Sequence, residues 1–431
     1  WPDEVKALLM LGMLYRRANP RWARPIEQAR PFFQGVLEHE PENVPALHNL
    51  ARMDAGSRLY DSLPARAAVL RQVAPESEWA IDVQTMAAFA LGDTVEIEGL
   101  VESFPEQSLV LRLYAVYNAM RFSLDPGDAV RLLARQESGT LNTDTGLPEG
   151  IEVDDDLSVI LAVMAALVGG RYDDVRAFLS DPPRSAAWDV WNAELVATDL
   201  VPVDEALMEQ VLRRLQAVDP EDRLRNPFEP LHDIFSVEVA TLERDFTAAK
   251  LLARLGRLDE AWTIQRRLAG HPPYLAFESL NQDAPGALAA DLYAIQGDRQ
   301  RALEVLRSLP FQLPMTAGSL SITTGSHARH LRAELEMELG DPEVARYLYA
   351  GLVEGFSPPD KLFLANAYDR LGQIAEAAGR TEDAVYYYDR FVRAWADADP
   401  ELQPRRTAVQ GRLEALRGAG ASAPEAVAPG D

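Results

Sequence analysis

A glycine followed five residues later by a small apolar residue recurs along this chain at intervals of about 40 residues. A glycine just past a helix end can adopt the left-handed conformation that closes the helix, and a small residue one turn into the next helix lets two backbones approach. The pattern therefore predicts a series of helical hairpins. In the second half the pairs are Gly256 and Ala261, Gly297 and Ala302, Gly340 and Ala345, and Gly379 and Ala384.

The same offset occurs earlier in the chain, so the repeat is a property of most of its length. Gly170 precedes Val175, and Gly92 precedes Ile97. The β-branched alternation that a sheet needs is scarce, whereas alanine, leucine, arginine and glutamate fill long segments. A repeat of about 40 residues over this length predicts about ten helix pairs and an all-α fold.

Apolar stripes support helices between the turn glycines. Segments 248–255 and 258–268 carry apolar residues at i, i+3, i+4 and i+7, and the turn between them is too short for anything except antiparallel packing. Segments 186–197 and 204–218 look like another helix pair, although the glycine register is lost there. We therefore predict an α-solenoid of stacked antiparallel helix pairs, an architecture that needs no single centre.

Two segments carry a more specific pattern, at the end and at the start of the chain. Both resemble the tetratricopeptide repeat, although the spacing of the middle units exceeds that family's repeat of about 34 residues. The resemblance implies a right-handed superhelix that holds a partner and performs no catalysis. The residues that carry it are Tyr368, Leu371, Gly372, Ala375, Gly379, Ala384, Tyr388 and Pro400 in the last unit, and Leu11, Gly12, Tyr15, Ala29, Phe33 and Pro41 in the first, which an insertion around 19–25 lengthens.

Composition excludes several classes of partner. The chain has 42 Lys and Arg against 67 Asp and Glu, a formal net charge of −25, which disfavours nucleic acid. The longest strongly apolar stretch, 157–168, is shorter than the roughly 18 to 20 residues that span a bilayer, so we predict no membrane insertion by this chain. The absence of cysteine removes disulfides, thiolate metal sites and thiol nucleophiles.

Breaks in the helical pattern suggest an organisation into four parts. We predict N-terminal repeats over 1–136, a loop over 137–156, C-terminal repeats over 157–417 and a disordered tail over 418–431, with further loops at 219–230 and 309–325.

The first residue and the lack of cysteine bear on the compartment. The chain begins with Trp1 where a native start has Met, so we expect a segment before it. A cysteine-free chain favours the cytoplasm, whereas an exported protein, or one tethered to a membrane through that earlier segment, remains an alternative.

No motif for chemistry stands out, so we predict no catalytic residue, no cofactor and no enzyme. Walker, dinucleotide and Gly-x-Ser-x-Gly patterns are absent from the sequence. Asp154, Asp155 and Asp156 fit the start of a helix better than a calcium loop. His327, His330 and Glu334 share one helix face and could ligate zinc, but a site needs further ligands, and we predict no metal.

The resemblance also implies where a partner binds. In tetratricopeptide repeats the first helix of each pair lines the concave surface. Because Asp291 and Asp369 are acidic, we expect a protein or peptide ligand that is basic or of mixed charge. The groove residues predicted in this way are Glu243, Phe246, Lys250, Arg254, Asp291, His327, His330, Glu334, Asn366, Asp369 and Gln373.

Two other functions compete with a binding scaffold. Long irregular arrays of this kind resemble the regulatory or sensory arms of larger bacterial signalling proteins, which carry kinase or DNA-binding domains. Helical hairpins of this length also build the toroids of carbohydrate-active enzymes, in which two converging carboxylates act. The sequence contains many acidic residues and singles out no such pair.

Overall fold

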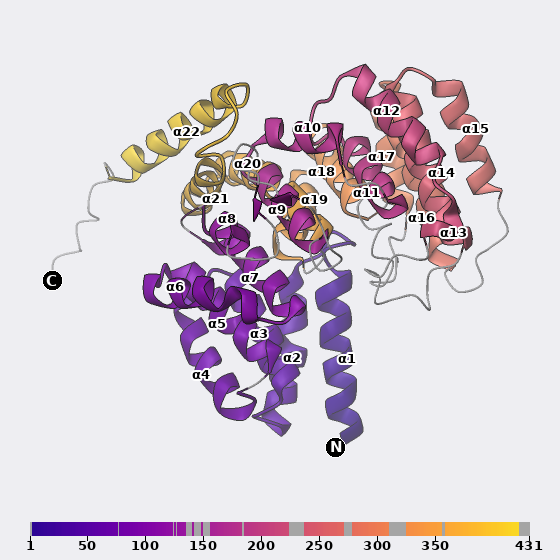
Figure 1. The fold of residues 1–431 in the computed structure, drawn as a ribbon. Helices are drawn as coiled ribbons and strands as arrows, with labels where there is room; N and C mark the ends of the chain where they lie inside the picture. The colour runs from indigo at the N-terminus through magenta and orange to yellow at the C-terminus, as the bar shows by residue number, and fades with distance from the viewer. Residues whose placement is uncertain are drawn as a thin grey trace.

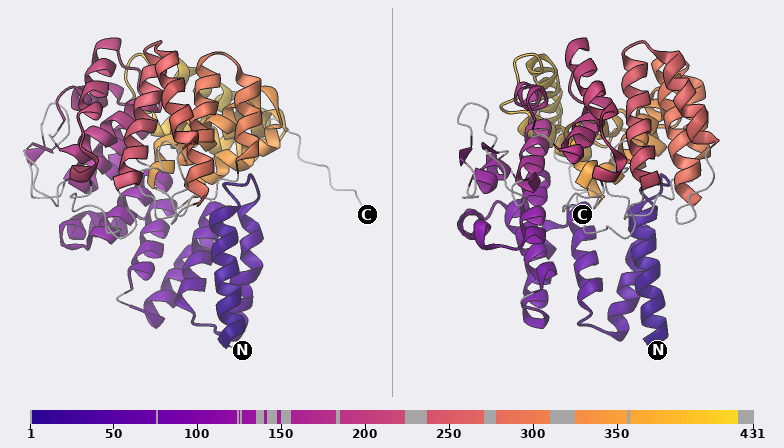
Figure 2. Two further views of the ribbon diagram at one scale, coloured as in Figure 1. Left: turned by 90° about the vertical axis from the view of Figure 1, so that its right-hand side faces the viewer. Right: turned by 45° about the vertical axis from the view of Figure 1, so that its right-hand side comes forward.

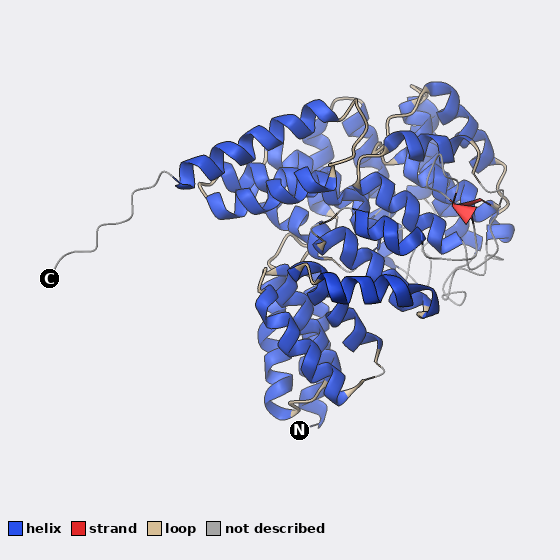
Figure 3. Cartoon of the chain, turned by 60° about the vertical axis from the view of Figure 1, so that its left-hand side comes forward, coloured by secondary structure: helices blue, strands red, loops and turns tan. Residues whose placement is uncertain are grey.

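The computed structural model of the chain is helical almost throughout (Figure 3). It describes residues 2–75, 77–123, 125, 127–134, 140–141, 148–149, 156–182, 185–223, 237–270, 278–309, 325–355 and 358–421. The predicted all-α class is confirmed, while the right-handed twist and the total of about ten pairs stay predictions.

The first part of the chain forms helices that pack as consecutive hairpins. They are α1 (Pro2–Ala18), α2 (Arg30–His39), α3 (Val44–Gly56), α4 (Leu63–Val73), α5 (Glu78–Leu91), α6 (Thr94–Ser103), α7 (Leu109–Phe122) and α8 (Gly127–Ala134), with the short 3-10 helices η1 (Ile26–Ala29), η2 (Tyr60–Ser62) and η3 (Phe104–Glu106).

The second part continues the hairpin pattern. Its helices are α9 (Asp156–Val168), α10 (Tyr172–Ser180), α11 (Ala186–Ala197), α12 (Glu205–Gln216), α13 (Pro220–Arg223), α14 (Val237–Arg254), α15 (Leu258–Ala269), α16 (Glu278–Ile295), α17 (Arg299–Ser308), α18 (His327–Leu339), α19 (Pro342–Glu354), η5 (Pro358–Phe363), α20 (Leu364–Ala377), α21 (Thr381–Ala394) and α22 (Gln403–Ala421).

The turn glycines explain why the helices end where they do. Five of the six predicted positions have φ between 68° and 87°, which an L side chain rarely adopts. Gly340 is the exception, with φ −125°, and Asp341 after it caps the next helix by accepting a hydrogen bond from the Glu343 amide. The left-handed glycines are Gly92, Gly170, Gly256, Gly297 and Gly379.

The glycine that follows a leucine in the first and last units, Gly12 after Leu11 and Gly372 after Leu371, is required by the packing of each hairpin. A Cβ atom on Gly372 of α20 would lie 2.4 Å from the Cδ1 atom of Tyr388 on α21, so only glycine lets this ring seat against the helix. The first hairpin repeats the arrangement, with a Cβ on Gly12 falling 2.8 Å from Cε1 of Phe33. Both aromatic rings are buried completely. The motif therefore encodes the packing of each hairpin.

The C-terminal repeats turn back onto the N-terminal repeats. Figures 1 and 2 show α1–α7, in indigo and purple, extending below a curved layer that the later helices form. The hydroxyls of Tyr60 on η2 and Tyr386 on α21 lie 2.6 Å apart, and Arg58 forms an ion pair with Asp383. These contacts join residues more than 300 positions apart, so repeats contact more than their sequence neighbours.

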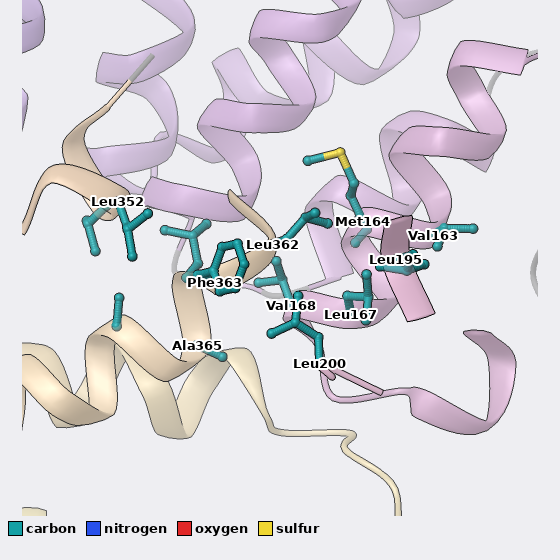
Figure 4. Packing of buried hydrophobic residues seen from close by; sticks show 14 of the residues in the cluster. Val163, Met164, Leu167, Val168, Leu195, Leu200, Leu352, Leu362, Phe363 and Ala365 are labelled. Carbon is teal, nitrogen blue, oxygen red and sulfur yellow. The ribbon is translucent and has the colours of Figure 1, made fainter. Parts of the chain in front are cut away.

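One hydrophobic cluster runs through both parts of the molecule. It extends from Leu47 to Leu413, and a smaller cluster around Phe33, formed by α1, η1, α2 and one face of α3, is the other cluster among the described residues. Figure 4 shows its centre, where Met164 and Val168 of α9 lie beside Leu362 and Phe363 of η5. The predicted boundary at 137–156 therefore does not separate two cores.

Two predicted segments, the loop over 137–156 and the tail over 418–431, differ in detail from the structure. Within 137–156, Thr140–Leu141 (β1) and Pro148–Glu149 (β2) pair as short antiparallel strands. Helix α22 continues to Ala421, into the predicted tail, and the rest of that tail lies outside the described residues, as do most of 219–230 and 309–325. Of the described helices, none has the length and apolar character needed to cross a membrane.

Candidate functional site

A pocket of about 450 Å³ opens between α18, α20 and the final helix α22. The inner faces of α18 and α20, which are the first helices of their hairpins, form two of its walls, and α22 forms the third. The lining residues are His330, Glu334, Asn366, Asp369, Arg370, Gln373, Arg405, Ala408, Val409 and Arg412. Five of the eleven predicted groove residues thus lie together: His330, Glu334, Asn366, Asp369 and Gln373.

Asp369 is the centre of a hydrogen-bonded network on the α20 wall. Its Oδ2 atom accepts from Nη2 and Nε of Arg405 at 2.6 and 2.9 Å, and its Oδ1 atom accepts from Nε2 of Gln373 at 2.8 Å. Nη1 of Arg405 donates to Oδ1 of Asn366 at 2.9 Å. Arg405 therefore fastens α22 to α20 and neutralises Asp369, which is only 3% exposed.

Glu334 is held in a similar way on the α18 wall. Nη2 and Nε of Arg370 donate to its two carboxylate oxygens at 2.6 and 3.0 Å, and the hydroxyl of Tyr349 donates at 2.7 Å. Burial acts to raise the pKa of Glu334, but the Arg370 hydrogen bonds and the neighbouring charges outweigh it, and the pKa is lowered. Glu334 is therefore ionised and paired at neutral pH.

His330 brings a neutral polar group to the pocket. Its ring lies 4.7 Å from the ring of Phe363 and 6.1 Å from that of Tyr349. Burial lowers the pKa of His330 to about 4, so the imidazole carries no charge at neutral pH. Its Nδ1 atom is buried and has no hydrogen-bond partner within the described structure.

Arg412 is the cation of the pocket with the most unused hydrogen-bonding capacity. Its Nη1 atom makes one long contact of 3.4 Å to the Tyr388 hydroxyl, which itself donates to Glu376 at 2.5 Å. The lining contains two carboxylates and three guanidinium groups, and the carboxylates are paired with Arg370 and Arg405. The acidic groove expected from the sequence is thus neutralised, and the remaining charge is positive.

The other six predicted groove residues do not line this pocket. Lys250 of α14 is completely buried, and its Nζ atom lies 2.8 Å from Nδ1 of His327 and 3.0 Å from Oδ2 of Asp291. Burial lowers the pKa of both Lys250 and His327. Lys250, His327 and Asp291 are buried inside the molecule, so these side chains do not form an open groove.

The remaining members of that group are buried or paired as well. Glu243 and Phe246 have no exposed surface, and the Phe246 ring lies 5.9 Å from Nζ of Lys250. Arg254 pairs with Asp199 at 2.8 Å and donates to the Val196 carbonyl at 3.2 Å. The inner face of α14 and α16 is therefore part of the interior.

The structure separates the three residues considered as metal ligands. His327 points to Lys250 and Asp291, whereas His330 and Glu334 border the pocket. In the part of the chain that the structure describes, no three histidine, aspartate or glutamate side chains are grouped as metal ligands.

Sequence reasoning missed five residues that complete the pocket, Arg370 on α20 and four residues on α22. Arg405, Ala408, Val409 and Arg412 are spaced by three, four and seven residues, so they share one face of α22. That spacing was visible in the sequence. The prediction omitted it because the family pattern describes helix pairs, and α22 follows the last pair.

The fold and the pocket together define a helical-repeat protein with a polar pocket between α18, α20 and α22. Residues 366–398, which include most of α20 and all of α21, match the family model of the tetratricopeptide repeat. This match and the all-helical architecture support a tetratricopeptide-like repeat family for the chain. No match is found among curated proteins.

Proposed function

We propose that this protein is a non-catalytic interaction scaffold that binds a segment of a partner protein in the pocket between α18, α20 and α22. Tetratricopeptide repeats generally mediate protein interactions, and the match includes four pocket residues, Asn366, Asp369, Arg370 and Gln373. The observation that carries the proposal is a pocket of about 450 Å³ lined by inner-face side chains of the matched repeat and its neighbours.

The pocket chemistry favours a ligand of mixed charge. Arg412 suits an acidic group, and the uncharged His330 with the Asn366 amide suits backbone or neutral polar groups. A strongly basic segment is disfavoured, because the two carboxylates of the pocket, Glu334 and Asp369, are already paired with Arg370 and Arg405. The same pairing gives no support to a carbohydrate-active enzyme, because Glu334 is an ionised, ion-paired carboxylate with a lowered pKa and therefore a poor general acid.

Selection from a displayed library of random peptides tests the proposal. The scaffold should select peptides that contain an acidic residue, and Arg412→Glu should weaken the selected peptides at least tenfold, about 1.4 kcal/mol, because it reverses the charge that faces the ligand. Calorimetry with the purified peptides measures the change.

The control for this experiment is Arg417→Glu. Arg417 lies on the same helix, is exposed and pairs with Asp389 at 2.8 Å outside the pocket. Its replacement should leave the affinity unchanged. Failure to select any peptide, or equal binding by wild type and Arg412→Glu, would contradict the proposed function.

A further inference from the structure

A second polar surface lines the inner face of the N-terminal hairpins, and the proposed partner site does not use it. The first helix of each hairpin contributes to it, and α3, α5 and α7 are joined there by one buried hydrogen-bonded network. The residues concerned are Arg16 on α1, His48 and Arg52 on α3, Asp82 on α5, and Tyr114, Asn118 and Arg121 on α7.

Asp82 is the centre of this network and is fully buried. Arg52 donates to its two oxygens at 3.0 and 3.1 Å, Asn118 donates at 2.9 Å, and Nε2 of His48 lies 2.7 Å away. Burial acts to raise the pKa of Asp82, but the Arg52 charge and these hydrogen bonds lower it. Burial lowers the pKa of His48, so the network as a whole is close to neutral.

Arg16 and Arg121 add positive charge that this network does not balance. Arg121 is 5% exposed; its guanidinium lies 4.5 Å from the Phe122 ring centroid, and its buried Nε atom has no hydrogen-bond partner in the described structure. Among the described residues, neither a hydrogen bond nor an ion pair reaches the Arg16 side chain. A buried guanidinium nitrogen without an acceptor, such as Nε of Arg121, is costly, and the half-buried Arg16 places a second cation near it.

The charged groups around Arg16 are mostly cations. They are Arg52, Arg17, Asp82 and Arg121, of which only Asp82 is acidic and it is already bonded to Arg52. Burial, followed by the charges of Arg52 and Arg17, lowers the pKa of Arg16 to about 9. A local excess of positive charge is unexpected in a chain with a net charge of −25.

Residues from the C-terminal repeats do not supply the missing negative charge. Lys361 of η5, whose surroundings include Arg121 and Arg52, is a buried basic residue that donates to the carbonyls of Val353 and Gly355 at 2.8 and 2.7 Å, and burial lowers its pKa well below the usual value. Two acidic neighbours come from this part of the chain: Asp360 is paired with Arg329, and burial raises the pKa of Glu354 to about 7, so it is only partly ionised at neutral pH.

We infer that this inner face is a second binding site, at which a compact anionic group, a carboxylate or a phosphate, binds between Arg16 and Arg121 beside the Arg52–Asp82 pair. Guanidinium groups bind both anions through paired N–H donors. Arg16 is only half-buried and the neighbouring Arg17 is exposed, which gives an anion access from the α1 side. The site is separate from the pocket at α22, so it stands or fails independently of the proposed function.

Calorimetric titration at constant ionic strength tests this site with two probes. Inorganic phosphate represents a free anion, and a blocked tetraglutamate peptide, compared with tetraglutamine, represents acidic side chains of a protein. At least one anionic probe should bind the full chain. Arg16→Gln should weaken that binding at least tenfold, whereas Lys6→Gln, an equal charge change at an exposed position of α1, should not.

Arg121→Met supplies a second variant and a second readout. Without ligand it should be at least as stable as the wild type, because it removes an unbalanced buried charge, and it should lose the anion binding. Binding of phosphate alone identifies a free anion, and binding of the peptide alone identifies acidic side chains. Absence of binding by both probes, or binding that Arg16→Gln leaves unchanged, would overturn the inference.

Discussion

Replacing Arg390 with alanine lowers the free energy of unfolding by about 3–5 kcal/mol, as expected when a buried charge with several hydrogen bonds is removed. Arg390 of α21 is 6% exposed, and its Nη1 atom donates to the carbonyls of Phe122 and Ser123 at 2.7 and 2.9 Å. These carbonyls are at the C-terminal end of α7, where a cation is favourable. Urea denaturation measures the loss.

Arg417→Ala is the control for this prediction. Arg417 is exposed and makes one ion pair, with Asp389, so its loss should cost less than about 1 kcal/mol. If Arg390→Ala costs no more than Arg417→Ala, the C-terminal repeats do not depend on their contact with α7. Comparing the two losses in the free energy of unfolding distinguishes the contribution of the contact between α21 and α7 from that of a surface ion pair.

Gly372→Ala should destabilise the protein by about 2–3 kcal/mol, because overpacking against a rigid buried ring forces side chains or backbone to move. The added Cβ would lie 2.4 Å from both Cδ1 and Cε1 of Tyr388. Tyr388 is held by the Glu376 and Arg412 contacts, so the ring has little freedom to withdraw. Thermal and urea unfolding both report the change.

Gly411→Ala is the matched control, since Gly411 lies inside α22 with open space at its Cβ position. There alanine should be neutral or stabilising by up to about 1 kcal/mol, because it favours the helix. Equal effects of the two substitutions would show that the Gly372–Tyr388 contact does not determine the packing of the last hairpin.

Local features of the fold were predictable from the sequence because they depend on neighbouring residues. Gly256, Gly297 and Gly379 close helices as expected, since the left-handed conformation is a property of the residue and its turn. Gly340 does not follow this rule, and the capping aspartate after it does not explain the difference, because Asp298 caps the helix after the left-handed Gly297 in the same way. The resemblance to the tetratricopeptide repeat was also visible in the sequence, because its residues, such as Gly372 and Tyr388, contact each other within one hairpin.

Long-range features were not predictable in the same way. The contact between Tyr60 and Tyr386 joins opposite ends of the chain, and no periodicity encodes it. Helical spacing placed Lys250 on an inner face, but whether that face is open or filled depends on distant packing, and the structure buries it. Asp369 was read as a free negative charge because Arg405, its partner, comes from a helix outside the repeat pattern.

The C-terminal repeats return to the N-terminal repeats at the Tyr60–Tyr386 contact, and a spin-label distance measures this approach directly. The chain has no cysteine, so Asp61→Cys and Glu382→Cys, both exposed and next to the Tyr60–Tyr386 contact, can be labelled without background. We predict a single short and narrow distance distribution in solution. A long or broad distribution, as in an open array where each further helix layer adds about 8–10 Å, would contradict the account.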